Sequence, residues 1–311
     1  MRKTIILSLY VLLFLPVILC ADEIQDSIAN IVNDLFMKAS SGEVQFRDLV
    51  EPSKEELIAM GAAAVPQMIT KLSTEDARER HTVEAIFKGI GDPAIPALIE
   101  ALSTDNLYQL RLASSCLGKI GNRDATPHLL GLFWHKEHTV KSASVTAVGD
   151  IKDSSAVGEV IIKLDDDAET VRKSAAVSLG KIGHQDAIDA LIIALDDPHF
   201  SVRYSAAGSL VKIGDISGKV ILSQYPALSS TAISYACDIW SQLKYSKALK
   251  QLEEILKESD DNYLRGFAIL AIANIDPKKA GKFIRKNIEE EKDLFVLSCF
   301  EKAYTIISDS K

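Results

Sequence analysis

The sequence predicts an all-α fold: an α-solenoid, a right-handed superhelix of about seven helix-pair repeats of 30–32 residues. The phrase "LGKIG" occurs at 117–121 and again at 179–183, with near copies elsewhere. Successive copies end about 31 residues apart, and apolar residues between them recur at helical rather than strand spacing. The ends of these phrases are Gly91, Gly121, Lys152, Gly183 and Gly214.

Composition agrees with helix packing through small side chains. Hydrophobic residues make up 47% of the 311 residues, but aromatic residues only 6%, so the apolar content is mostly Ala, Ile, Leu and Val. The net charge of −8 argues against a nucleic-acid partner, because neutralising phosphates requires a basic surface.

Residues 1–21 are predicted to be an export signal. A short basic start, "MRK", precedes an apolar run too short for an ordinary membrane span, and "CAD" offers small residues for cleavage. We therefore expect a protein of the bacterial periplasm or cell envelope. The alternative is a lipoprotein with Cys20 as its acylated first residue, although Leu19 is large for that motif. A lipid on Cys20 would be the only membrane contact.

Helices that cap the repeats are expected at both ends of the mature chain. Residues 22–54 would form the N-terminal cap, with an amphipathic helix over 24–36. Ser53 and Glu56 form a capping-box pattern at the start of the next helix. Residues 277–311 would form the C-terminal cap from two helices, because terminal repeats face water on one side.

The repeat region is predicted to span 55–276, with two helices in each unit. In the unit 184–214, Asp186 is the expected cap of the first helix. Asp197 would cap the second helix, with Pro198 at its first position, and Gly214 would end it. Asp166 and Glu169 form a similar capping pair one unit earlier. The buried stripe of the second helix is Val202, Ala206, Leu210 and Ile213.

The stretches "PALIEAL" at 96–102, "ETVRKSAAVSLGKIG" at 169–183 and "DDPHFSVRYSAAGSLVKIG" at 196–214 resemble HEAT repeats. The short period is similar to that of the phycobilin-lyase type. This resemblance covers roughly residues 55–276 and implies a protein-interaction scaffold whose second helices line a concave surface. A few members of the family are enzymes.

The residues give little support to catalysis. Repeated His-Glu pairs, which bind iron in the deoxyhypusine hydroxylase-like proteins of this repeat class, do not occur. His128, His135 and His138 gather near Glu137, and two histidines with a carboxylate could bind a metal ion. However, His135 and His138 fall in a predicted turn, where polar residues are expected in any case. Cys116, Cys237 and Cys299 lie in apolar surroundings and are expected to be buried thiols. We therefore expect no enzyme activity, cofactor or metal site.

A basic side chain recurs near the start of successive second helices, together with acids of the preceding turns. In the HEAT family such positions commonly form a ladder between neighbouring repeats, and ligand binding is the alternative. The predicted ladder is Arg111, Lys141, Arg172, Arg203, Asp166 and Asp197.

The opposite ridge of the second helices is the predicted partner-binding surface, because it faces away from the buried stripe. Aromatic and cationic side chains on it, such as Tyr204 and Lys173, would anchor a protein or peptide partner. The ridge comprises Ser142, Thr146, Asp150, Lys173, Val177, Lys181, Tyr204, Gly208 and Lys212.

The expected function is thus a non-catalytic exported scaffold. The alternatives are an enzyme-accessory or lyase-like protein, or a lipid-anchored structural protein of the envelope.

Overall fold

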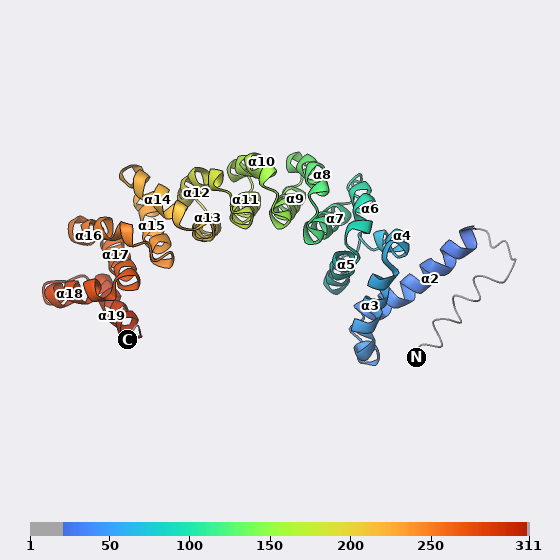
Figure 1. Ribbon diagram of the computed structural model, residues 1–311, viewed down its shortest axis with the longest axis horizontal. Coiled ribbons are helices and arrows are strands. Elements are labelled where there is room, and N and C mark those ends of the chain that lie inside the picture. The colour runs from blue at the N-terminus through green and yellow to red at the C-terminus, as the bar shows by residue number, and fades with distance from the viewer. Residues whose placement is uncertain (1–20, 310–311) are drawn as a thin grey trace. The chain divides into compact units, whose positions relative to one another are not determined.

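A computed structural model describes residues 21–309, and residues 1–20 of the predicted signal segment, with Cys20, lie outside these residues. Every regular element within 21–309 is an α-helix or a short 3-10 helix, and no strand occurs in this range (Figure 1). The all-α prediction is therefore confirmed. In chain order, seven helix pairs run from α4–α5 to α16–α17 within the described residues.

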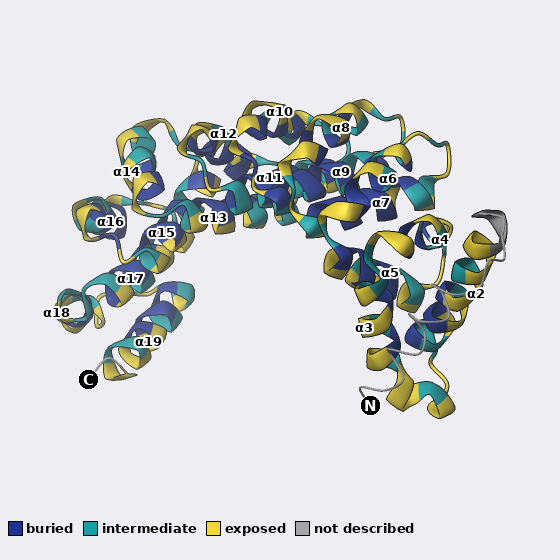
Figure 2. Cartoon of the chain, turned by 45° about the vertical axis from the view of Figure 1, so that its right-hand side comes forward, coloured by how far each residue is buried: buried dark blue, intermediate teal, exposed yellow. Residues whose placement is uncertain are grey.

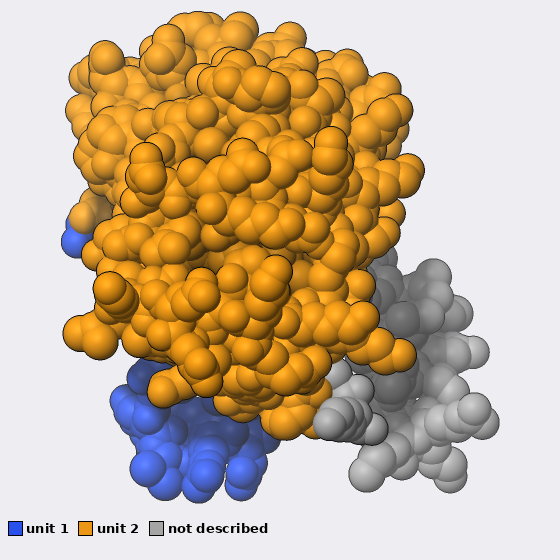
Figure 3. All heavy atoms as spheres, turned by 90° about the vertical axis from the view of Figure 1, so that its left-hand side faces the viewer, with its two compact units in different colours: residues 1–101 blue, residues 102–311 orange. Residues whose placement is uncertain are grey.

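The chain divides into two compact units, residues 1–101 and 102–311 (Figure 3). In unit 1, α3 packs against both α2 and α5, and α4 packs against α6. Phe36, Leu57 and Phe87 are among its buried side chains. The helices of unit 1 are α2 (Ala21–Ser40), α3 (Val50–Met60), α4 (Val65–Ile69), α5 (Ala77–Ile90) and α6 (Ile95–Glu100).

Unit 2 is a row of stacked helix pairs. Its second helices α7, α9, α11, α13, α15 and α17 each contact the next in the row, and the last of them contacts α19. The first helices α8, α10, α12, α14 and α16 lie together along the other side (Figure 1). The helices are α7 (Leu107–Ile120), α8 (Thr126–Gly131), α9 (His138–Ile151), α10 (Val157–Ile162), α11 (Glu169–Ile182), α12 (Ile188–Ile193), α13 (Phe200–Ile213), α14 (Asp215–Gln224), α15 (Ser230–Gln242), α16 (Leu249–Glu258), α17 (Asn262–Ile275), α18 (Pro277–Asn287) and α19 (Leu294–Asp309).

The core of unit 2 follows the predicted stripes. Val202, Ala206 and Leu210 of α13 are completely buried, and Ile213 is partly exposed at the end of the helix. Figure 2 shows the buried residues along the lines where neighbouring helices meet. Each pair covers the apolar stripe of the next, so the core is continuous along the row.

The first helices differ from the prediction of one regular helix per position. α12 has only six residues, with a 3-10 turn before it at Gln185–Ala187 and another after it at Ala194–Asp196. The cap predicted at Asp186 is wrong, because the His184 side chain accepts from the backbone N–H of Asp186. The 3-10 turn starts the element two residues earlier than the spacing of apolar residues indicated.

The predicted caps of the second helices are also wrong in detail. α13 begins at Phe200, and Asp197 accepts the N–H of His199 in the turn before it, at 2.8 Å. Asp166 likewise accepts the N–H of Ala168, at 3.0 Å, so its capping box does not form. Both carboxylates also bind a basic side chain of the preceding second helix, which holds them away from the helix start. Each aspartate therefore stabilises the turn before the helix and does not cap the helix itself.

At the N-terminal end, the capping box predicted at Ser53 is wrong. α3 already begins at Val50, and Ser53 is a buried residue inside it. The amphipathic helix predicted over 24–36 is present as part of α2, and the two closing helices are α18 and α19. The limits of the capping segments stay a prediction. No helix among the described residues is long and apolar enough to cross a membrane.

The repeated phrase ends α5, α7, α9, α11 and α13 at a residue with positive φ, whereas α17 ends at Asp276 with φ −138°. Gly183 has φ 73° and ψ 21°, the left-handed conformation that glycine adopts without a Cβ clash. Lys152 and Lys244 stand at the corresponding positions of other repeats, with φ 59° and 50°. The left-handed residue after the helix is thus kept even where the sequence has lysine and not glycine. This conformation is less favourable for lysine, because its Cβ crowds the backbone.

Candidate binding surface on the second helices

The predicted ridge lies on the exposed side of α9, α11 and α13. Tyr204, Gly208 and Lys212 of α13 are exposed, as is Lys173 of α11, while Val177 is half-buried. These residues are spaced by four along each helix and therefore share a face. The exposed members of this set are therefore accessible to solvent.

Other ridge residues already bond to one another. The Ser142 hydroxyl lies 2.8 Å from that of Ser174 in α11, and the Thr146 hydroxyl donates to the same Ser174 hydroxyl at 3.3 Å. Lys181 donates to Asp150 of the preceding repeat at 2.5 Å. These contacts tie α9 to α11, so this part of the ridge contributes to stacking and offers a partner fewer open polar groups.

An aromatic pair marks the α13 part of the ridge. The rings of Phe200 and Tyr204 stack with centroids 5.8 Å apart, and the side chains are 63% and 67% exposed. The Arg203 guanidinium lies 6.0 Å from the Phe200 ring. Large exposed rings held in place by their neighbours lose little entropy on binding, so they suit an anchor for a partner.

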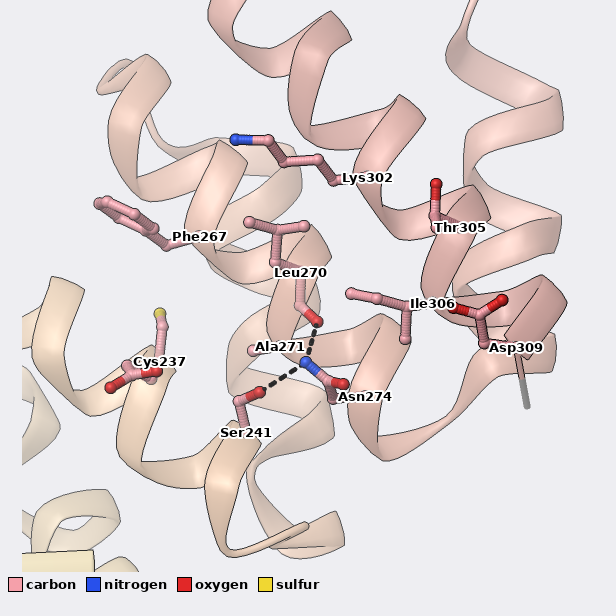
Figure 4. Close-up of a pocket in the computed structure, with 11 residues that line it drawn as sticks. Cys237, Ser241, Phe267, Leu270, Ala271, Asn274, Lys302, Thr305, Ile306 and Asp309 are labelled. Atoms are coloured by element: carbon pink, nitrogen blue, oxygen red, sulfur yellow. Dashed lines mark hydrogen bonds between the residues drawn. The ribbon is translucent and has the colours of Figure 1, made fainter. Parts of the chain in front are cut away.

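A hollow of about 520 Å³ lies further along the same row, where α15, α17 and α19 meet (Figure 4). Asn274 is fixed within it, because its amide donates to the Ser241 hydroxyl at 2.9 Å and to the Leu270 carbonyl. Lys302 extends along one side of the hollow in Figure 4. The lining residues are Cys237, Asp238, Ser241, Phe267, Leu270, Ala271, Asn274, Lys302, Thr305, Ile306 and Asp309.

Aromatic rings lie beside this hollow. Phe295 lies 4.8 Å from Tyr263 and 6.0 Å from Phe267, measured between ring centroids. Tyr263 is 64% exposed. The sequence pattern alone did not single out these residues. The signal was present: Tyr263, Phe267 and Leu270 follow helical spacing, but the face they occupy depends on how α19 closes the row.

The ladder forms two rungs in the structure. Lys141 donates to both oxygens of Asp166 at 2.6–2.8 Å, and Arg172 donates to both oxygens of Asp197 at 2.6 and 3.1 Å. Burial raises the pKa of each carboxyl, but the hydrogen bonds and charges of the partners outweigh burial and hold the pKa below the usual range. Each rung links one second helix to the next repeat.

The ladder stops where the acceptor changes. The acid lies 25 residues after the base in both rungs, but 25 residues after Arg111 stands Lys136, and Arg111 is exposed. For Arg203 the corresponding residue is Leu228. Arg203 instead donates to the carbonyls of Asp197 and Pro198, at 2.7 and 3.0 Å. These two bases therefore do not bridge repeats through an acid of this turn.

The histidine cluster is spread over turns and helix starts. The His135 Nδ1 accepts the backbone N–H of Glu137 at 3.0 Å, and the His138 Nδ1 lies 3.1 Å from the Thr170 hydroxyl. Within residues 21–309, no three His, Cys, Asp or Glu side chains are arranged to hold a metal ion. Cys116, Cys237 and Cys299 are buried, and none of these three forms a disulfide.

Comparison with known proteins supports the repeat reading. The family model described as HEAT repeats matches residues 65–149, 136–211 and 157–225, together spanning 65–225. No curated protein matches the chain.

Two solved structures share the fold at low sequence identity, and a third resembles the chain more weakly. Kap95p, the yeast importin-β, in its structure with RanGDP is 13% identical with a TM-score of 0.57, covering 90% of this chain and 48% of Kap95p. YibA of Escherichia coli is 18% identical with a TM-score of 0.51, covering 81% of this chain and 95% of YibA. The CpcE–CpcF phycocyanin lyase of Nostoc is 19% identical with a TM-score of 0.40, over 78% of this chain and 93% of that one. Identities this low inform on the fold alone.

Proposed function

The chain belongs to the family of HEAT-repeat proteins, and from this premise we propose that it is a non-catalytic scaffold that binds a protein or peptide partner on the second helices of unit 2. Stacked repeats create an extended surface, and binding specificity lies in scattered exposed side chains. The proposed surface comprises the ridge of α9, α11 and α13 and the hollow between α15, α17 and α19.

The observation that carries the proposal is the exposed aromatic pair of α13 beside exposed lysines. Tyr204 is 67% exposed and stacks on Phe200, with exposed Lys173 at the equivalent position of α11 and exposed Lys212 further along α13. Aromatic side chains in this setting are frequent anchors of interfaces, because they bury a large area on binding. The structural neighbour Kap95p binds RanGDP, which supports a protein partner as the natural ligand class of such a surface.

The proposal is tested by removing the anchor without disturbing the core. We expect Tyr204→Ala combined with Lys173→Ala to lower partner capture from an envelope extract by about tenfold, as for the loss of an interface hot spot. The matched control is Lys219→Ala with Lys247→Ala, which removes two exposed lysines from the first-helix side. Unchanged capture by the Tyr204 variant, quantified by mass spectrometry, would count against the ridge. Lys302→Ala changes only the hollow, so its effect on partner capture shows whether that part of the surface contributes separately from the ridge.

Absence of catalysis is part of the proposal and has its own test. Elemental analysis of the purified protein is expected to give a metal content near zero. Treatment with a chelator is expected to leave the helical circular-dichroism signal unchanged. A stoichiometric metal required for folding or for turnover of a substrate would favour the enzyme alternative.

We also propose export to the periplasm or cell envelope, on the strength of the basic and apolar pattern in residues 1–21. Intact mass of the protein isolated from its native cell distinguishes the two forms. Cleavage near Ala21 without added mass indicates a signal peptide. A mass increase from acyl chains on Cys20 indicates a lipoprotein.

A further inference from the structure

A second surface lies on the first-helix side of unit 2, centred on Ile193 at the end of α12. Ile193 is 75% exposed although it is a large aliphatic residue. It lines two adjoining hollows, of about 740 and 480 Å³, and Asp196 also lines both. We call these two hollows together the Ile193 groove. Ile162, one repeat earlier at the same position, is 54% exposed and extends the apolar row.

The groove combines an apolar floor with an acidic rim. Leu164, Ala190 and Ala194 contribute apolar lining on one side of Ile193, and Pro226 and Leu228 on the other. A groove with this lining buries an aliphatic side chain favourably.

The rim charge is dominated by carboxylates. Asp165, Asp167 and Asp196 are exposed there. Arg172, a cation in the same hollow, is committed to Asp197 and to the Asp166 carbonyl. His199, at the edge of the hollow, lies near Asp197 and Glu169 and within 3.0 Å of Arg172. The exposed charge that a ligand meets is therefore negative.

We propose that the Ile193 groove binds a basic segment of a protein partner, in which an apolar side chain packs against Ile193 and flanking lysines or arginines face the aspartates of the rim. Charge complementarity selects this occupant, because an acidic peptide, a nucleic acid or an anionic membrane would be repelled. The surface is separate from the second-helix site, since it is built from the other helix of each pair. It can therefore fail or hold independently of the proposed function.

The test uses a random peptide library displayed on phage, selected on the full mature protein. We expect the selected peptides to be rich in Lys or Arg around an aliphatic or aromatic residue. The best peptides, synthesised and labelled, should bind Ile193→Ser at least about tenfold more weakly than wild type in fluorescence anisotropy, as expected from the loss of one buried aliphatic side chain. Asp196→Asn should weaken binding about two- to fivefold, and added salt should weaken it further.

Matched controls keep the result specific. The C-terminal end of α14 lines the groove through Gln224, whereas Ile216, 42% exposed, lies at its N-terminal end, so Ile216→Ser is a control for the loss of an exposed isoleucine. Asp260→Asn is a control for the loss of an exposed carboxylate, elsewhere in unit 2. Both are expected to bind the peptides as wild type does, as is the Tyr204→Ala, Lys173→Ala variant. Acidic selected peptides, or equal binding to Ile193→Ser, would overturn the proposal. So would a dimer of the wild-type chain that Ile193→Ser dissociates, because it would place a second copy in the groove.

Discussion

Two glycines in neighbouring second helices predict opposite outcomes for the same substitution. Gly180 of α11 is buried against α13, and a Cβ added to it would lie 2.3 Å from the Ser209 hydroxyl oxygen and 2.8 Å from the Ser209 Cα. Gly208 of α13 is exposed, and a Cβ added there would meet no heavy atom within 4 Å. Both residues lie inside 14-residue helices, so the helix context is matched.

The magnitudes follow from two competing effects. Alanine is favoured over glycine by about 1 kcal/mol in a helix interior, and this gain applies at both sites. At Gly180 the clash is with backbone of the next helix, so α11 and α13 must separate, at a cost of about 1–3 kcal/mol for overpacking. The separation also weakens the buried bond from the Ser209 hydroxyl to the Ala176 carbonyl, now 2.7 Å, worth about 1 kcal/mol. We therefore expect Gly180→Ala to destabilise the protein by about 1–3 kcal/mol.

Gly208→Ala, in contrast, is expected to stabilise by about 0.5–1 kcal/mol. Urea unfolding followed by circular dichroism measures both variants, and their free energies of unfolding should differ by about 1.5–4 kcal/mol. Equal stability of the two alanine variants would refute this account of close helix packing.

Three further outcomes are expected. Lys152→Gly should stabilise the protein by about 0.5–1 kcal/mol in the same unfolding assay, because glycine relieves the left-handed conformation at φ 59°, and a loss of stability would contradict this. Asp197→Asn should cost about 1–3 kcal/mol at pH 7 through its contact with Arg172. The pKa of Asp197 is lowered in the fold, so its contribution is complete above about pH 4 and is lost as the pH falls through the folded pKa, and the gap between wild type and variant should narrow there. A gap that is constant from pH 7 to pH 3 would exclude an ionic rung. Burial raises the pKa of Cys237 to about 12, so iodoacetamide at pH 8 should modify it only after unfolding, as mass spectrometry of digests would report.

Much of the fold could be predicted from the sequence, because the same apolar pattern recurs in each repeat. A stripe such as Val202, Ala206 and Leu210 can be buried only against a neighbour of the same kind, so its period predicts stacking. Helix starts were less accessible. Asp166 and Asp197 have the right chemistry for caps, but the bases of the preceding repeat compete for the same carboxylates, and that competition depends on contacts 25 residues away in the chain.

The candidate surfaces could likewise be predicted only in part from the sequence. Helical spacing by itself determined which face of each second helix points away from the core, and it placed Tyr204, Gly208 and Lys212 on that face. Only the tertiary structure decided which ridge residues are committed to one another, as Lys181 is to Asp150, and where the row is hollowed. The reason is physical: a period reports the environment of one helix, whereas a rung, a groove or a close approach at Gly180 depends on the distance between two helices that are separated in sequence.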